Sequence, residues 1–293
     1  MPPLCRDAWF AIDRAENARL IRHIESGGVS TLLYGGNANL YNIALSEYDN
    51  LLDILESAAA ENTWIIPSVG PYFGTLLDQA AILRGRKFPA AMILPTIAVS
   101  SPAGVRAAFA KFVERAGIPA VLYIKEERYV TPQIVAELVS EGFVAWIKYA
   151  VMRDNPSEDI LLRDIANRVD PALLVSGMGE QPVPVHWRNF GIRAFTSGCV
   201  CVAPRLSQQM LESLRDDDFA SVARICEIFR ELESLRNAHG PIPVLHDAVA
   251  ACGIAQTGPA LPLLADLPRA LRESVAAAAQ RLRAANNDPA VTR

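Results

Sequence analysis

Short apolar runs alternate with amphipathic stretches along the first 215 residues, and this alternation limits the possible folds more than any other feature. The strand-like runs are Thr31–Tyr34, Trp64–Pro67, Ala91–Leu94, Ala120–Ile124, Val144–Tyr149, Leu173–Ser176 and Ala194–Thr196. The helical patterns between them are Leu45–Ala60, Phe73–Arg84, Pro102–Ala116, Pro132–Ser140, Glu158–Arg168 and Pro204–Arg215. Continuously apolar strands separated by helices are typical of a parallel sheet with helices packed against it.

This rhythm predicts an α/β chain folded as one (β/α)₈ barrel over residues 1–215. Seven strands are visible, and an eighth is expected near the N-terminus, where Arg6 and Asp7 make it short or incomplete. The competing architecture is a doubly wound sheet, which needs a G-x-G-x-x-G turn after an early strand. Gly35-Gly36-Asn37 follows a strand but lacks that motif, so the barrel is favoured.

The rest of the chain is helical in pattern and has no glycine-rich or serine-rich linker before it. Its helical stretches are Phe219–Ala238, Pro243–Cys252 and Pro268–Ala285. We therefore expect residues 216–293 to form a helical extension that packs on the barrel.

Charge and composition exclude several classes of partner. The formal net charge of −4 gives no general attraction to nucleic acid or to anionic lipid. No apolar stretch is long enough for a membrane span, and MPPLCRDAWF lacks the pattern of a signal peptide. Five scattered cysteines and four histidines match no metal-binding spacing. We expect a cytoplasmic protein that binds no nucleic acid, membrane or metal.

Lys148 is the most informative residue, because it interrupts the apolar run Phe143–Met152 and is one of only four lysines. A lysine held in apolar surroundings often has a lowered pKa, and a neutral amine is a nucleophile towards carbonyl groups. Strand ends at the C-terminal face form the active site of a barrel. The alternatives are that Lys148 reaches the rim of the barrel or makes a buried ion pair, and the local sequence leaves both open.

Tyr123 lies on the preceding strand, in the segment Tyr123–Arg128. Neighbouring parallel strands end at one edge, so Tyr123 and Lys148 could both point into the mouth of the barrel, where a phenol could relay protons. Tyr123 could instead be a core residue. Lys125 lies in a charged stretch and is expected to be a solvated rim residue.

The turn Gly35-Gly36-Asn37-Ala38-Asn39 follows the strand-like run Thr31–Tyr34. Successive backbone N–H groups in a glycine turn can point to one place and bind an anion such as a carboxylate. The turn could equally be an ordinary connection between a strand and a helix.

Several segments together resemble the dihydrodipicolinate synthase and N-acetylneuraminate lyase family over nearly the whole chain. They are Gly35–Asn39 where the family has G-T-T-G-E, Tyr123–Arg128 for Y-N-x-P-x-R, Trp146-Ile-Lys148 for G-x-K, Val202-Ala-Pro204 for N-V-A-P, and Pro241–Val244 for N-P-I-P-V-K. Their order in a chain of repeated strands and helices makes the resemblance specific.

The resemblance implies a (β/α)₈ barrel with a helical extension, assembled as a homo-oligomer, a dimer or a tetramer. It implies an imine between Lys148 and pyruvate or a longer 2-oxo acid, with Tyr123 as the proton relay. The amides of Gly36 and Asn37 would hold the substrate carboxylate, and Arg128 would lie at the entrance, where some members bind a second carboxylate. No cofactor is required, because the protonated imine is the electron sink.

The sequence also departs from the family pattern. Gly36 and Asn37 replace the threonine pair, and Pro95-Thr96-Ile97 replaces the P-Y-Y segment whose tyrosine reaches the neighbouring subunit. Asn39 and Cys201 replace the family's glutamate and the asparagine of N-V-A-P. We therefore expect a divergent member that acts on another 2-oxo acid, or one that has lost catalysis.

Two functions follow from these observations. The first is a class I aldolase or lyase that cleaves, adds or dehydrates a 2-oxo acid, with aldolase and dehydratase both open. The second is a non-catalytic protein that binds a 2-oxo acid or sugar acid. The residues expected to line the site are Ser68, Ile97, Ser176, Met178, Ser197 and Cys199. Of these, Ser197 is a candidate substrate contact, although Ser176 and Ser197 could equally satisfy local backbone groups.

Overall fold

The computed structural model describes residues 1–291, and their packing forms two compact units. The central unit is Ile66–Thr196. The terminal unit combines Met1–Ile65 with the segment from Ser197 onward. The division expected near residue 215 stays a prediction.

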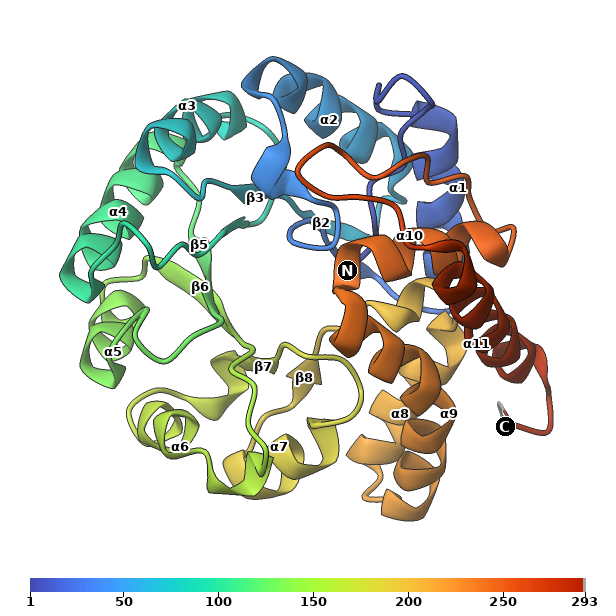
Figure 1. The fold of residues 1–293 in the computed structure, drawn as a ribbon. Coiled ribbons are helices and arrows are strands. Elements are labelled where there is room, and N and C mark those ends of the chain that lie inside the picture. Colours follow the sequence, from blue (N-terminus) through green and yellow to red (C-terminus); the bar gives the residue numbers. More distant parts are fainter. Residues whose placement is uncertain (292–293) are drawn as a thin grey trace. The chain divides into compact units, whose positions relative to one another are not determined.

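The central unit is a six-stranded parallel sheet with helices between successive strands (Figure 1). The strands, in spatial order, are β3 (Ser68–Val69), β4 (Ala91–Ile93), β5 (Ala120–Ile124), β6 (Val144–Tyr149), β7 (Leu174–Ser176) and β8 (Ala194–Phe195). The helices are α3 (Phe73–Leu83), α4 (Pro102–Ala116), α5 (Pro132–Ser140), α6 (Ile160–Ala166) and α7 (Val183–Phe190), with 3₁₀ turns η2 (Pro156–Glu158) and η3 (Pro171–Leu173). Every residue of β5 is buried, as expected for a parallel strand covered on both faces.

Local sequence sets the helix ends of this unit. The Ser101 side chain accepts a hydrogen bond from Gly104 N–H, and Thr131 does the same for Ile134. The Asp159 side chain accepts a hydrogen bond from Leu162 N–H. Helix α6 therefore begins at Ile160, two residues after the start expected at Glu158. Such caps satisfy backbone donors that the first turn of a helix leaves unpaired.

Strand register separates the two faces of the central sheet. Tyr123 pairs with Lys148, and Lys148 pairs with Val175. Register partners in adjacent strands point to the same face, and the next residue along points to the other. Tyr149 therefore points away from Lys148, and its ring packs edge-on against His186 of α7 with centroids 6.4 Å apart. Lys148 and Tyr123 consequently lie on the face opposite to the helices.

The terminal unit is mostly helical. It contains α1 (Arg14–Glu25), β1 (Thr31–Leu33), η1 (Leu40–Asn42), α2 (Leu45–Ala58), most of β2 (Trp64–Ile66), η4 (Cys199–Cys201), α8 (Pro204–Arg215), α9 (Phe219–His239), α10 (Pro241–Ala251) and α11 (Arg269–Asn287). Helices α9, α10 and α11 pack against one another (Figure 1). The buried face of α11 includes Ala278, Ala279 and Leu282, and small alanines let neighbouring helices approach closely.

One expectation about an individual element was wrong. Within residues 1–291 no strand precedes Thr31, and the N-terminal segment makes only an isolated antiparallel bridge between Arg6 and Ile12. Pro2 and Pro3 lack the N–H donors that a strand ladder needs. The expected run Trp64–Pro67 forms β2 over Trp64–Ile66, and a separate strand that was not expected, β3, follows Pro67, which cannot donate to a strand ladder.

Residues Cys199–Cys201 form the 3₁₀ turn η4, in which the Cys199 and Cys201 thiols are buried and form no disulfide.

Candidate active site

Lys148 and Tyr123 meet on the sheet face that carries no helices. Lys148 is only 1% exposed, and its Nζ lies 3.7 Å from the centre of the Tyr123 ring. Burial disfavours the charged ammonium, whereas the electron-rich face of the phenol ring stabilises it. The sequence placed these residues on adjacent strand ends, and the structure brings them into direct contact. The alternative in which Lys148 reaches the rim of the barrel does not agree with this burial.

Gly177 leaves the space through which the Lys148 side chain passes. A Cβ at this position would lie 3.0 Å from Lys148 Cγ and 2.6 Å from the carbonyl oxygen of Tyr149. The second distance is far shorter than a normal contact and involves backbone, so no larger residue fits without a shift. Sequence reasoning missed Gly177, although its place directly after β7 was the available signal.

A polar network lies behind β6, on the side facing the helices. The Tyr149 hydroxyl donates to Asp159 Oδ2 at 2.6 Å, and both residues are buried. Arg153 Nε lies 3.0 Å from the same oxygen, and Arg153 also pairs with Glu127 in the loop after β5. Glu127, in the charged stretch that follows Tyr123, therefore belongs to this network.

Asp159 is charged although it is buried. Burial alone would raise its pKa, but hydrogen bonds from Arg153, Tyr149 and the Leu162 N–H outweigh that effect and lower the pKa. Burial and the neighbouring carboxylate raise the pKa of Tyr149, so its hydroxyl keeps its proton and donates to Asp159.

Ser176 belongs to the same helix-facing side of the sheet. It pairs in register with Tyr149, and its hydroxyl lies 2.8 Å from His186 Nδ1. Burial lowers the pKa of His186 to about 4, so the ring is neutral at pH 7. The expectation that Ser176 lines the site is therefore wrong, because its side chain points to the helix layer.

The glycine turn in the terminal unit is closed by its own hydrogen bonds. Asn39 N–H donates to Gly36 O at 2.9 Å, and Asn39 adopts a left-handed φ of 54° that asparagine tolerates. A Cβ at Gly36 would meet the Tyr41 ring at an ordinary 3.8 Å, so packing does not require glycine there. The Asn37 amide Nδ2 donates to the Met1 carbonyl at 3.0 Å.

The two remaining predicted site residues have different surroundings. Arg128 is exposed in the turn after β5, where a residue at the entrance of a barrel is expected. Ser197 is buried in the terminal unit, and its hydroxyl accepts a hydrogen bond from Val200 N–H at 3.0 Å. It thus satisfies local backbone, one of the two roles expected for it. The part of these residues in substrate binding stays a prediction.

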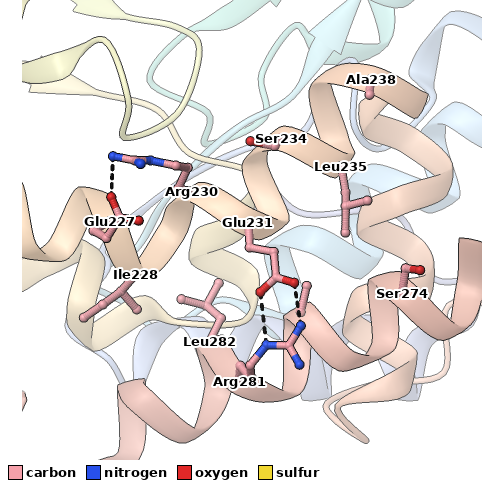
Figure 2. A pocket seen from close by; sticks show the side chains of 11 residues that line it. Glu227, Ile228, Arg230, Glu231, Ser234, Leu235, Ala238, Ser274, Arg281 and Leu282 are labelled. Atoms are coloured by element: carbon pink, nitrogen blue, oxygen red, sulfur yellow. Dashed lines mark hydrogen bonds and ion pairs between the residues drawn. The ribbon is translucent and has the colours of Figure 1, made fainter.

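A groove between α9 and α11 in the terminal unit has a volume of about 770 Å³ (Figure 2). Its walls include Ile228, Leu235 and Leu282, and Arg281 Nε lies 3.0 Å from Glu231 Oε2 across it. None of its described lining residues is a lysine, cysteine or histidine. Its chemistry is that of packed helices with a surface ion pair, which contributes little energy.

Solved structures with this fold include members of the family that the sequence resembles. Dihydrodipicolinate synthase from Bacillus clausii has a TM-score of 0.84 at 20% identity, covering 95% of each chain. Sialic acid aldolase from Ruminococcus gnavus has a TM-score of 0.83 at 17% identity, covering 96% of this chain and 95% of the aldolase. A prophage protein of the dihydrodipicolinic acid synthase family from E. coli K12, in complex with pyruvate, has a TM-score of 0.82 at 18% identity, covering 96% and 97%.

These likenesses confirm the fold class: the chain has an α/β, (β/α)₈ barrel fold with a helical C-terminal region. They confirm the resemblance at the level of fold. The sequence itself matches no protein-family model and no curated protein. Among residues 1–291, every helix is too short or too polar to cross a membrane.

Proposed function

We propose that this chain is a divergent member of the dihydrodipicolinate synthase and N-acetylneuraminate lyase family, acting as a class I aldolase or lyase on a pyruvate-like or longer 2-oxo acid. The observation that carries the proposal is the buried amine of Lys148 against the Tyr123 ring, 3.7 Å from its centre. Solved structures of the same fold include a sialic acid aldolase and a protein in complex with pyruvate, which supports this chemistry.

In the proposed reaction, neutral Lys148 Nζ attacks the carbonyl carbon of the 2-oxo acid, and the carbonyl oxygen leaves as water. The resulting protonated imine accepts the electron pair of the bond that breaks next, either carbon–carbon in retro-aldol cleavage or carbon–hydrogen before dehydration. After retro-aldol cleavage the enamine is protonated at carbon, whereas in dehydration it expels the adjacent hydroxyl group, which takes up a proton and leaves as water. A further water molecule then hydrolyses the imine and releases the product from Lys148. Tyr123 is the proposed proton carrier, a role that contributes about 10²–10⁴-fold to a rate.

The remaining site roles belong to the same proposal. The amides of Gly36 and Asn37 bind the substrate carboxylate, Arg128 lies at the entrance, and Ser197 contributes to the pocket wall. The structure favours backbone over side chain for the carboxylate, since the Asn37 amide already donates to a carbonyl. A homo-oligomeric assembly and a cytoplasmic location also remain proposals.

Trapping with borohydride tests the imine directly. Wild-type protein incubated with pyruvate and borohydride is expected to carry a stable adduct on the peptide that contains Lys148, seen by mass spectrometry. Lys148→Ala and the bulkier Lys148→Met should lose the adduct completely. Lys125→Ala is the matched control, because Lys125 is an exposed lysine at the end of β5, and it should leave the adduct unchanged. An adduct that persists in both Lys148 variants would refute the role of this lysine.

A second function is favoured by one feature of the glycine turn. Gly36 and Asn37 offer no hydroxyl where the family has two threonines, so a relay through this turn is missing. A non-catalytic protein that binds a 2-oxo acid or sugar acid would tolerate that loss. Pyruvate binding by calorimetry without any trapped adduct would support this second function.

A further inference from the structure

The loops that follow β5 and β6 are joined by one arginine. The β5 loop contains Glu127, and the β6 loop contains both Arg153 and Asp159. Arg153 contacts both carboxylates, through Nε and Nη2 to Asp159 at 3.0 and 3.1 Å and through Nη2 to Glu127. These loops leave the two strands that carry Tyr123 and Lys148, so the arginine bridges the connections on either side of the candidate site.

The bridge is attached to β6 itself. Tyr149 follows Lys148 directly, and its buried hydroxyl donates to Asp159 Oδ2 at 2.6 Å. At the same strand ends, Ala150 N–H donates to Ile124 O at 2.8 Å. A displacement of Asp159 would therefore move the backbone on which the Lys148 side chain stands.

Charge makes this bridge stronger than an ordinary surface pair. Asp159 is 1% exposed and remains ionised, while Arg153 is 23% exposed. A buried carboxylate requires a partner, because the loss of that partner leaves an uncompensated charge in a poorly solvated place. The arginine fork also satisfies several oxygens in a fixed geometry, which a lysine point charge cannot reproduce fully.

We propose that Arg153 is a positioning residue for Lys148: it clamps the β5 and β6 loops through Glu127 and Asp159 and fixes the amine over the Tyr123 ring. This inference rests on the proposed function, in which Lys148 forms the imine. Arg153 contacts Asp159 and Glu127, so it acts on Lys148 through Asp159 and Tyr149. Misplacing a reacting group by about 1 Å can lower a rate about a hundredfold.

The test measures the initial rate of trapped pyruvate adduct over a range of pyruvate concentrations. Arg153→Met should lower the maximal rate about ten- to hundredfold, while the half-saturating pyruvate concentration changes by less than about twofold. Arg153→Lys should recover part of the rate. A merely structural loss would lower the amount of folded protein, which circular dichroism reports, without this selective effect on the maximal rate.

Arg106 provides a matched control in the same unit. It also bridges two carboxylates, with Nε 3.2 Å from Glu137 Oε2 and a second contact to Glu141. These contacts join helices α4 and α5 rather than loops at strand ends, so Arg106→Met should trap pyruvate at the wild-type rate. Equal losses in both variants, or no loss in Arg153→Met, would overturn the positioning role.

Two milder variants cover the case in which Arg153→Met fails to fold. Glu127→Gln removes only the exposed arm of the clamp, and Tyr149→Phe removes only its link to β6. At least one should lower the maximal rate severalfold, and wild-type rates in both would overturn the inference. A wild-type chain that forms no adduct refutes the proposed function instead, so the two failures are distinguishable.

Discussion

The residues with proposed roles fall into two halves, the β5–β6 pair of the central unit and the glycine turn Gly35–Asn39 of the terminal unit, and these halves are constructed differently. The first half consists of side chains fixed by strand register, since Tyr123 pairs with Lys148. The second half consists of backbone amides in a turn, and its one long side chain, Asn37, already donates to a carbonyl.

The difference concerns how much each half depends on individual side chains. Lys148 is enclosed by Tyr123 in front, the Gly177 backbone beside it and the Asp159 network behind its strand. A change at these positions must move something that is tightly packed. A Cβ at Gly36 would make only an ordinary contact, 3.8 Å from the Tyr41 ring. Gly36, Asn37 and Asn39 of the turn are among the departures from the pattern of the family that the sequence resembles, while the lysine and the tyrosine are both present.

Of the changes predicted here, removal of the Tyr123 hydroxyl should have the largest effect on the rate of proton transfer. Tyr123→Phe keeps the ring face under Lys148, so the pyruvate adduct should still form. Proton transfer should slow by about 10²–10⁴-fold, because the acid–base group is gone. Exchange of the pyruvate methyl protons with deuterated water, followed by NMR, measures this step without a second substrate. Wild-type exchange in the variant would remove Tyr123 from the mechanism.

A smaller effect is expected from filling the space beside Lys148. Gly177→Ala places a methyl group 2.6 Å from the Tyr149 carbonyl oxygen, and such overpacking costs about 1–3 kcal/mol of unfolding free energy. It should also slow adduct formation, since Lys148 Cγ must move. The matched control is Gly74→Ala in α3, where the added Cβ meets nothing within 4 Å and should stabilise the helix by up to about 1 kcal/mol.

Denaturant unfolding and the trapping rate are both measured for this pair of variants. If Gly177→Ala were as stable as the wild type and trapped pyruvate equally fast, the close packing of Gly177 would not determine the position of the Lys148 side chain.

Strand register explains why the β5–β6 half of these residues could be predicted from sequence. The runs Ala120–Ile124 and Val144–Tyr149 were predicted with the bounds that the structure shows. Continuously apolar runs can be recognised as buried strands from the sequence. In the structure, parallel pairing of these strands places Tyr123 beside Lys148. The local pattern therefore identified Lys148 as a candidate, although that pattern left its role open.

The polar network behind the lysine could not be predicted in the same way. Tyr149, Asp159 and Arg153 come together through the path of a loop, and loop paths depend on tertiary contacts rather than on periodicity. Ser176 was assigned to the wrong face because its one-residue offset from Val175 decides its direction. Asp159 did offer a signal, since aspartate before an apolar run is a common helix cap.

The smallest effect on stability and on proton exchange is expected for a substitution in the glycine turn. Gly36→Thr restores a family hydroxyl at a position where the Cβ has a normal 3.8 Å contact with Tyr41. Unfolding free energy should change by less than about 0.5 kcal/mol, as for most unstrained substitutions. By contrast, Gly28→Thr in the same unit forces a φ of 90° on a β-branched residue and should cost about 1–3 kcal/mol of unfolding free energy.

Exchange of the pyruvate methyl protons should stay within severalfold of wild type in Gly36→Thr. The reason is that the proposed proton relay depends on Tyr123. A hundredfold faster exchange in Gly36→Thr would instead show that the absence of a threonine hydroxyl limits the exchange rate of this protein.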